Sequence, residues 1–310
     1  MRPSFPQRPS LPSRAVNDPS YGRGTHTIDD ACFSDTDELL ARLRERFGSP
    51  EYRPPLLPAV ALQIHDLTRR SDTSIAQVLA LVRRDPLIAA QVLRRAQSPM
   101  FASKAPPRSL EDAAARLGMN GMRDLVFEAA LSGTVFRAKG FEDAMDAIRK
   151  HSLLVAYCTQ AVSSLVSVGE DGAYLAGLLH DVGLMAGLHA VAELCRKSKP
   201  ELEIIATVLR DVHVEAGEIV ARLWNLPPAL QAVISAHHVP RVGNAIVPLA
   251  ACVVVGESIA VTLGGSARVG VVELEAPSAA GLAMAKEGLG LDDAAIAQIT
   301  EHLRKMFAPR

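Results

Sequence analysis

Apolar residues recur at helical spacing along most of the chain. In "DTDELLARLRERFG", Leu39, Leu40, Leu43 and Phe47 share one face and Gly48 follows as a stop signal. This pattern predicts a short amphipathic helix over residues 35–50. Its apolar face could dock a partner or a second copy of the chain.

Cap signals divide the next stretch into short helices. Ser74 and Gln77 have capping-box spacing ahead of an apolar stripe, and Asp85-Pro86 combines a cap with proline in the first turn. Another helix is expected to begin at Ser109 and stop at Gly118, and the one after it to stop near Gly133. The stripe after Ser74 consists of Ile75, Val78, Leu79 and Val82.

The second half of the chain contains longer helical patterns. They cover about 142–167, 171–180, 201–224, 228–237, 247–262 and 291–306. Only "SARVGVVELEAP", residues 266–277, favours a strand, and no fixed-period repeat is visible. The pattern predicts an all-α protein, a multi-helix bundle.

Composition narrows the function classes. The 310 residues carry a formal net charge of −1, which gives no electrostatic reason to expect a nucleic acid or a membrane as a partner. No apolar run approaches the length of a membrane span.

The cysteines form no CxxC pair, which favours free thiols in a reducing, cytoplasmic setting; they are Cys32, Cys158, Cys195 and Cys252. Residues 1–34 are rich in Pro, Ser and Arg and are predicted to be disordered.

Histidines gather in apolar helical surroundings. Imidazole and carboxylate together suit Fe, Mn or Zn, and a shared carboxylate can bridge two ions. A lone histidine is usually hydrogen-bonded filler, and we expect no ligand role for the surface helix histidines His65, His189 and His302, but a His-Asp pair and a His-His pair among buried helices favour a shared pocket. The candidate ligands are His151, His180, Asp181, His213, His237 and His238.

Several sequence blocks, in order, resemble the HDOD family, the HD-related output domains of the HD superfamily of metal-dependent phosphohydrolases. These blocks are "LLPAV", "VRRDPLIAAQVLRRAQSPMF", "SLEDAAARLGMNGMRDLVF", "AGLLHDVGL" and "HVEAGEIVARLWNLPPALQAVISAHHVP". The resemblance implies an HD-like helical fold with an N-terminal helical subdomain (52–140), an HD-like subdomain (141–262) and a C-terminal extension (263–310) that ends in a helix. It also implies that the six candidates form the metal pocket, for one or two divalent ions, with Glu257 near the final acidic ligand of the family's enzymes.

Two departures from the active enzymes bear on function. The resemblance implies a lysine where Leu184 stands, and a Glu and a Gly-Tyr-Pro run where "HHVPRVGN" has neither. A non-catalytic regulatory module of bacterial signal transduction is therefore expected, acting on other signalling proteins, through self-association or by sensing a ligand. The alternative is a metal-dependent phosphohydrolase acting on a nucleotide or cyclic dinucleotide, with Asp181 as its catalytic centre.

A third possibility is DNA binding. "LEDAAARLGMNGMRDLVFEAAL" has the form of a helix, a glycine turn and a second helix. The second helix offers Arg123 alone among the acids Asp124 and Glu128, so phosphate contacts would be poor. Helix packing is the better interpretation of this segment.

Overall fold

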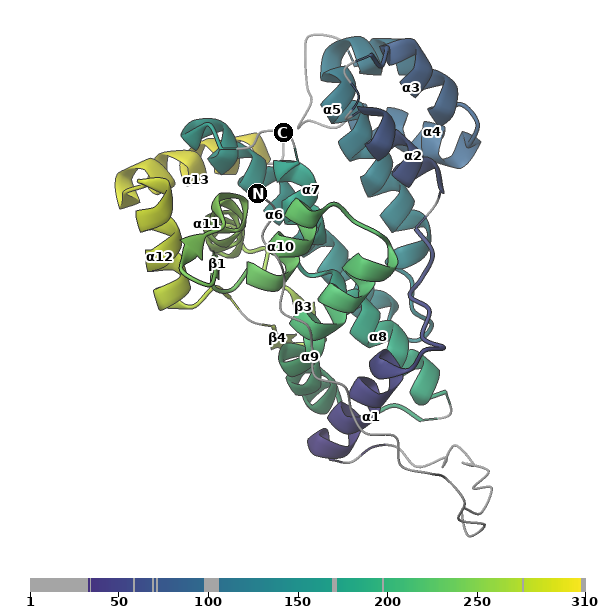
Figure 1. The fold of residues 1–310 in the computed structure, drawn as a ribbon, viewed down its shortest axis with the longest axis vertical. Coiled ribbons are helices and arrows are strands. Elements are labelled where there is room, and N and C mark those ends of the chain that lie inside the picture. The colour runs from purple at the N-terminus through teal and green to yellow at the C-terminus, as the bar shows by residue number, and fades with distance from the viewer. Residues whose placement is uncertain are drawn as a thin grey trace, which may run out of the picture.

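In the part of the chain that it describes, the computed structural model shows helices and two short hairpins (Figure 1). This confirms the predicted all-α class. It describes residues 33, 35–57, 59–68, 70, 72–97, 106–168, 172–196, 198–274 and 276–307. Apart from Phe33, the tail predicted to be disordered lies outside these residues.

The N-terminal helices form a block at the upper right of Figure 1. The predicted caps are present: Ser74 and Gln77 make a capping box, Asp85 accepts from the amides of Leu87 and Ile88, and Ser109 caps the next helix. Ile75 was wrongly assigned to the buried stripe: it is 36% exposed, because it occupies the first turn beside the cap. The block comprises α2 (Ala59–Thr68), α3 (Ile75–Val82), α4 (Pro86–Ala96), α5 (Leu110–Ala130) and a wider π-helical turn (Leu131–Val135).

Helix α5 breaks where the sequence predicts a stop. Gly118 has φ 66°, a left-handed value that glycine adopts at little cost, and helical structure resumes directly after it. Beyond the break, Arg123 is 4% exposed and pairs with Asp124 at 2.9 Å. This guanidinium is therefore engaged inside the fold rather than presented for phosphate contacts.

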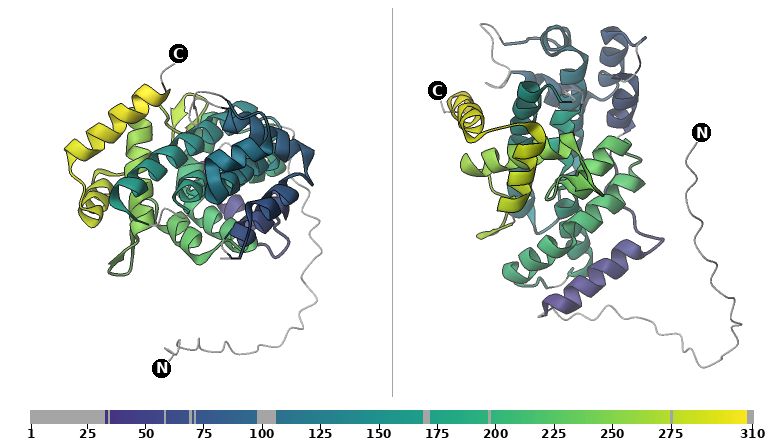
Figure 2. Two further views of the ribbon diagram at one scale, coloured as in Figure 1. Left: turned by 90° about the horizontal axis from the view of Figure 1, so that it is seen from above. Right: turned by 60° about the vertical axis from the view of Figure 1, so that its left-hand side comes forward.

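The larger half of the molecule, drawn from teal to yellow in Figure 2, consists of α6 and the helices that follow it. α7 and α11 pack on α6, α8 packs on α9, and α12 covers α11. The helices are α6 (Glu142–Val166), α7 (Ala173–Leu179), α8 (Val182–Leu194), α9 (Leu202–Leu223), α10 (Pro228–Ala236), α11 (Pro248–Thr262), α12 (Ala279–Leu289) and α13 (Asp293–Phe307).

Two antiparallel hairpins interrupt the helices. β3 (Arg268–Val269) pairs with β4 (Val272–Glu273) inside the segment that was predicted to favour a strand. β1 (Arg241–Val242) pairs with β2 (Ala245–Ile246), a hairpin that the pattern did not predict. Helices α8 and α12 were also missed.

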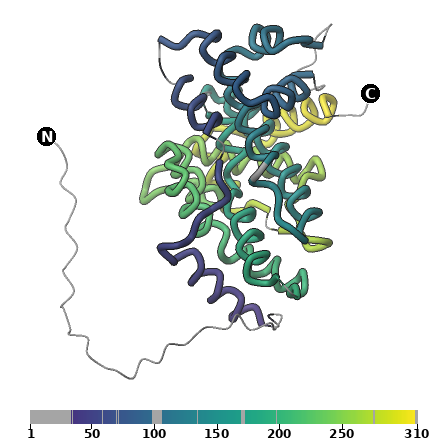
Figure 3. Tube along the Cα trace, turned by 90° about the vertical axis from the view of Figure 1, so that its right-hand side faces the viewer, coloured from purple at the N-terminus to yellow at the C-terminus, as the bar shows by residue number. Residues whose placement is uncertain are grey.

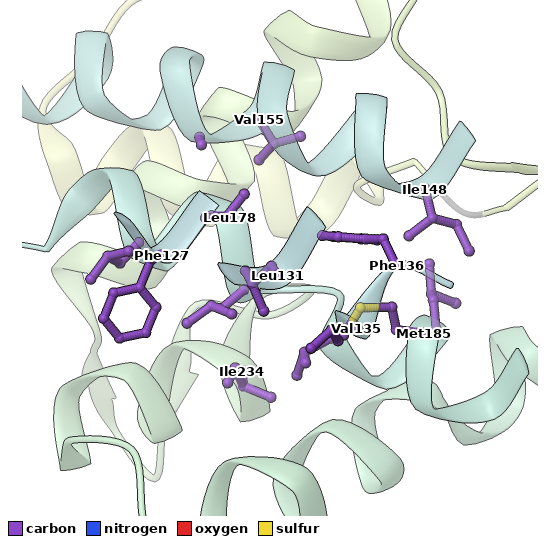
Figure 4. Close-up of a cluster of buried hydrophobic side chains, with 14 of the residues drawn as sticks. Phe127, Leu131, Val135, Phe136, Ile148, Val155, Leu178, Met185 and Ile234 are labelled. Atoms are coloured by element: carbon purple, nitrogen blue, oxygen red, sulfur yellow. The ribbon is translucent and has the colours of Figure 1, made fainter. Parts of the chain in front are cut away.

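One hydrophobic core joins the two halves of the fold (Figure 4). Phe127 and Leu131 come from the N-terminal block, Val155 from α6, Leu178 from α7 and Ile234 from α10. Side chains from separate parts of the sequence thus pack together, which fixes α7 and α10 relative to α5.

Helix α1 (Thr36–Gly48) lies apart from the N-terminal block and packs on α9 and α8. Its apolar face (Leu39, Leu43 and Phe47) is buried there, so that face is occupied by the chain itself. Ion pairs join Arg44 to Glu215 at 3.3 Å and Arg46 to Glu193 at 2.9 Å.

The chain returns from α1 to α2 along the side of the molecule, as the purple segment in Figure 3 shows. Trp224, at the end of α9, donates its indole N–H to the carbonyl of Pro55 at 3.0 Å. We call residues 49–57 the strap, because they connect the two ends of the molecule.

One stretch corrects the expectation about membrane-span length. Ala173–Leu194 is long and apolar enough by length and composition, yet 89% of its most apolar window is buried within the fold. It also contains the junction between α7 and α8. The stretch is therefore built as a core segment of two helices.

Candidate metal centre

His180 and Asp181 occupy the junction between α7 and α8. His180 ends α7, and Asp181 stands at the N-cap position of α8. Unlike Asp35 and Asp85, which cap their helices, the Asp181 side chain makes no capping hydrogen bond. Such a cap contributes about 1 kcal/mol, so this carboxylate forgoes a local stabilisation.

The Asp181 carboxylate lies between two pairs of histidines instead. Its Oδ2 is 3.3 Å from Nε2 of His180 and 3.6 Å from Nε2 of His151. Its Oδ1 is 3.2 Å from Nε2 of His237 and 3.9 Å from Nε2 of His213. One carboxylate therefore faces four imidazoles, two with each oxygen.

Backbone carbonyls orient these four rings. The Nδ1 atom of each ring lies 2.6 to 2.8 Å from a backbone carbonyl oxygen. His151 faces the carbonyl of Gly265, and His180 faces that of Gly177. His213 faces the carbonyl of Arg210, and His237 faces that of Ile234. Because a carbonyl only accepts, each Nδ1 carries the proton and donates it. This leaves Nε2 directed at Asp181 as the nitrogen that could bind a metal ion, since a backbone partner on the other ring nitrogen is the usual arrangement behind a metal-bound histidine.

The donors form two groups that could each hold a metal ion. His151, His180, Asp181 and Glu257 offer ligand atoms within 4.8 Å of one another, and His213, His237 and His238 do the same. The structure thus brings together all seven residues singled out from the sequence. Glu257 belongs to the first group and is buried on α11.

Burial and mutual charge shift the titration of this cluster. Burial alone would lower the pKa of His180, but Asp181 and Glu257 outweigh it and raise that pKa to about 9. Burial alone would raise the pKa of Asp181, yet the positive charge of His180 and the imidazoles that face its carboxylate hold that pKa well below its usual range. Burial, with the charges of His237 and His213, lowers the pKa of His238 to about 3. The raised pKa of His180 indicates that the group of His151, His180, Asp181 and Glu257 stabilises positive charge.

The donor set fits a divalent transition-metal ion. The Nε2 atoms of His151 and His180 are 3.3 Å apart beside a carboxylate, so their lone pairs need a proton or a metal ion between them. His237 Nε2 is buried without a hydrogen bond of ordinary geometry, although it faces Asp181. Such an ion would supply Lewis acidity at this point and would neutralise anionic groups.

Glycines allow the helices that carry these ligands to approach closely. A β carbon on Gly183 would lie 1.7 Å from the carbonyl oxygen of His213, and one on Gly177 would lie 2.7 Å from Cα of Ala156. The sequence reasoning missed these positions. The glycine two residues after Asp181 was visible, but its contact with α9 depends on the folded packing.

The other histidines that the structure describes lie elsewhere. His189 shares a hydrogen bond with the carbonyl of Val135 at 2.8 Å, His65 packs edge-on to Phe127, and His302 is exposed on α13. Leu184, at which the family resemblance implies a lysine in active enzymes, is 2% exposed in α8. It belongs to the hydrophobic core.

Residues 55–240 match the family model of the HDOD domain. Three solved structures are similar in fold. An HDOD domain protein with unknown function from Geobacter sulfurreducens is 24% identical, with a TM-score of 0.64, over 89% of this chain and 100% of that one. A "Putative metal-dependent phosphohydrolase" from Shewanella amazonensis SB2B is 18% identical, with a TM-score of 0.61, over 88% and 99%. A "Putative signal transduction protein" from Marinobacter aquaeolei VT8 is 21% identical, with a TM-score of 0.61, over 90% and 66%.

An uncharacterized protein of Treponema pallidum (strain Nichols) is 25% identical over 229 residues, which are 69% of this chain and 42% of that relative. The chain thus spans less than half the length of this relative. The fold of this chain and its match to the family model together define an HD-like protein. The chain belongs to the HDOD family. The subdomain boundaries at residues 140 and 262 stay predictions.

Proposed function

We propose that this protein is a non-catalytic regulatory module of bacterial signal transduction whose HD-like pocket binds one or two divalent transition-metal ions. The position of Asp181 carries the proposal, because one buried carboxylate faces two groups of nitrogen donors. Imidazole and carboxylate together suit Fe, Mn or Zn. The similarity to a structure named as a signal transduction protein agrees with the regulatory role.

Two observations favour a binding role over catalysis. All of the candidate ligands except His238 are buried, whereas a catalytic metal needs an open position for water or substrate. Leu184 also places an apolar side chain in α8 where the enzymes of the superfamily carry a cation. Phosphoryl chemistry depends on such cations to neutralise developing negative charge.

Metal analysis of the purified chain tests the binding. After incubation with Fe²⁺, Mn²⁺ or Zn²⁺ and dialysis, the wild type is expected to retain metal and Asp181→Asn to lose most of it. Asp211→Asn is the matched control, because Asp211 is exposed on the helix that carries His213. Equal metal content in the wild type and Asp181→Asn would refute the proposed site.

A metal-dependent phosphohydrolase acting on a nucleotide or cyclic dinucleotide is the second candidate. The shared carboxylate favours it, because two-metal hydrolases hold their ions on bridging groups. A screen with bis(p-nitrophenyl) phosphate and cyclic di-GMP separates the two functions. We expect no turnover above that of Asp181→Asn; metal-dependent turnover that is lost in this variant would establish the enzyme.

The cellular setting proposed for this module is the reducing cytoplasm. Cys158 and Cys252 are free and buried, which agrees with thiols that are not needed for disulfides. We also propose that its output passes to other signalling proteins or to a second copy of the chain.

A further inference from the structure

A cavity lies away from the candidate metal centre, between α4, the segment after the π-helical turn and the start of α6. Its volume is about 970 Å³, and none of the seven candidate metal ligands lines it. Two carboxylates, Glu142 and Asp146, line it together with five basic side chains: Arg94, Arg95, Arg137, Lys139 and Arg149. A chain with a formal net charge of −1 thus concentrates positive charge around one hollow.

Much of this positive charge is not neutralised locally. Among the residues that the structure describes, Arg94 and Arg137 have neither an ion pair nor a side-chain hydrogen bond. Asp146 already pairs with two cations, Arg149 at 2.5 Å and Lys150 at 2.7 Å. Both unpaired guanidiniums are therefore available to an anion from outside the chain.

The same cavity has an apolar part. Leu87, in the first turn of α4, is 76% exposed at its wall, and Phe136 lines it beside the core. In Figure 4 Phe136 lies next to Ile148 of α6. An exposed leucine beside unpaired arginines gives the cavity both an apolar contact surface and anion-binding groups. The volume of the cavity is within the range of small-molecule sites.

We propose that this cavity binds a phosphate-bearing small molecule of nucleotide size. The planar fork of arginine matches two oxygens of a phosphate and forms strong charge-assisted hydrogen bonds. Leu87 and Phe136 would contact the base or another apolar part of the ligand. The charge surrounds a hollow rather than following a long stripe, which favours a small molecule over a nucleic acid duplex.

The cavity is also connected to the helix that ends at the metal centre. Arg95 in its wall pairs with Glu128 of α5 at 2.6 Å, and Glu128 accepts a hydrogen bond from Tyr174 of α7 at 2.7 Å. A phosphate that binds Arg95 would compete with Glu128 for this guanidinium. The competition would also affect the hydrogen bond by which Tyr174 of α7 holds Glu128, and His180 stands at the end of that helix.

Calorimetric titration of the full chain with GDP and with inorganic pyrophosphate, in EDTA, tests the proposal without metal at the HD-like pocket. The wild type is expected to bind GDP, and Arg94→Gln/Arg137→Gln to weaken binding by about tenfold or more, since each lost contact is charge-assisted. Arg42→Gln/Arg222→Gln removes the same charge from exposed positions outside the cavity and is expected to bind within about twofold of the wild type.

The site is refuted if the wild type binds neither GDP nor pyrophosphate, or if both double variants weaken binding equally. Loss of GDP binding in His180→Ala, with binding kept in Arg94→Gln/Arg137→Gln, would place the ligand at the metal centre and overturn the proposal. Tighter binding of a poly-glutamate peptide than of GDP would also overturn it, because the cavity would then be a contact for an acidic protein. Because metal is excluded, these outcomes are independent of the proposed metal site.

Discussion

Gly183 faces the backbone carbonyl of His213 so closely that a β carbon would lie 1.7 Å from the oxygen. Such a distance is impossible, so any side chain at this position must separate α8 from α9. Each of these helices supplies part of the candidate metal centre: Asp181 precedes α8, and His213 lies within α9. The spacing between the two helices therefore sets the distance between Asp181 and His213.

Gly183→Ala is expected to lower the free energy of unfolding by about 1–3 kcal/mol, the usual effect of overpacking, and to reduce the metal content of the protein. Urea denaturation and metal analysis measure the two effects. Gly133→Ala is the control, because no described part of the structure lies within 4 Å of the added carbon. Unchanged metal retention in Gly183→Ala would show that the helix spacing is not needed for binding.

Leu184→Lys is expected to destabilise the fold rather than to create phosphodiesterase activity. Leu184 is buried in the core, and an unpaired charge there costs about 3–5 kcal/mol. Leu184→Met preserves most of the volume and is expected to cost less than about 1.5 kcal/mol. Thermal unfolding compares the variants; a Leu184→Lys protein as stable as the wild type would mean that the lysine reaches solvent or an acidic partner.

Trp224→Phe is expected to weaken the attachment of the strap, residues 49–57, to the end of α9. It removes the hydrogen bond to the carbonyl of Pro55, worth about 1 kcal/mol, and should increase amide hydrogen exchange in residues 49–57. Tyr52→Phe is the matched control on the strap itself, because the buried Tyr52 hydroxyl has no hydrogen-bond partner among the described residues. Faster exchange in both variants alike would contradict a specific role for the indole.

Cys158 and Cys252 are expected to resist alkylation in the folded protein. Burial raises the pKa of each thiol to about 12, so only about one in ten thousand is ionised at pH 8. Their folded pKa exceeds the unfolded value, so their contribution to stability is present below about pH 9 and is lost as the pH rises toward 12. Mass spectrometry after iodoacetamide treatment, with and without urea, measures this; equal labelling in both would contradict it.

The sequence predicted those helices that carry local signals. Ser74, Asp85 and Ser109 are caps whose effect depends on neighbours only a few residues away, and the structure contains all three. Helix α8 was missed because it is buried on nearly every side, so its sequence has no polar face to reveal a period. The docking of α1 on α9 is a tertiary contact for which the sequence offers no local signal.

The candidate site was predictable as a set of residues but not as an arrangement. His180 and Asp181 stand out in an apolar run, and the order of the other histidines led to the same family. The carbonyl of Gly265, which orients His151 from 114 residues away, depends on the path of the loop after α11. The position of Asp181 between both histidine pairs likewise follows from the meeting of four helices and could not be read from spacing.

The placement of α1 determines how mechanical load would enter the molecule. Because α1 is attached to α9 rather than to α2, tension applied ahead of Thr36 reaches the helix that carries His213 before it reaches the N-terminal block. Anything that pulls α1 away would first break the pairs of Arg44 with Glu215 and of Arg46 with Glu193. Helix α1 is thus coupled to the helix that carries His213, a candidate metal ligand, even though more than 160 residues separate Arg44 from His213 in sequence.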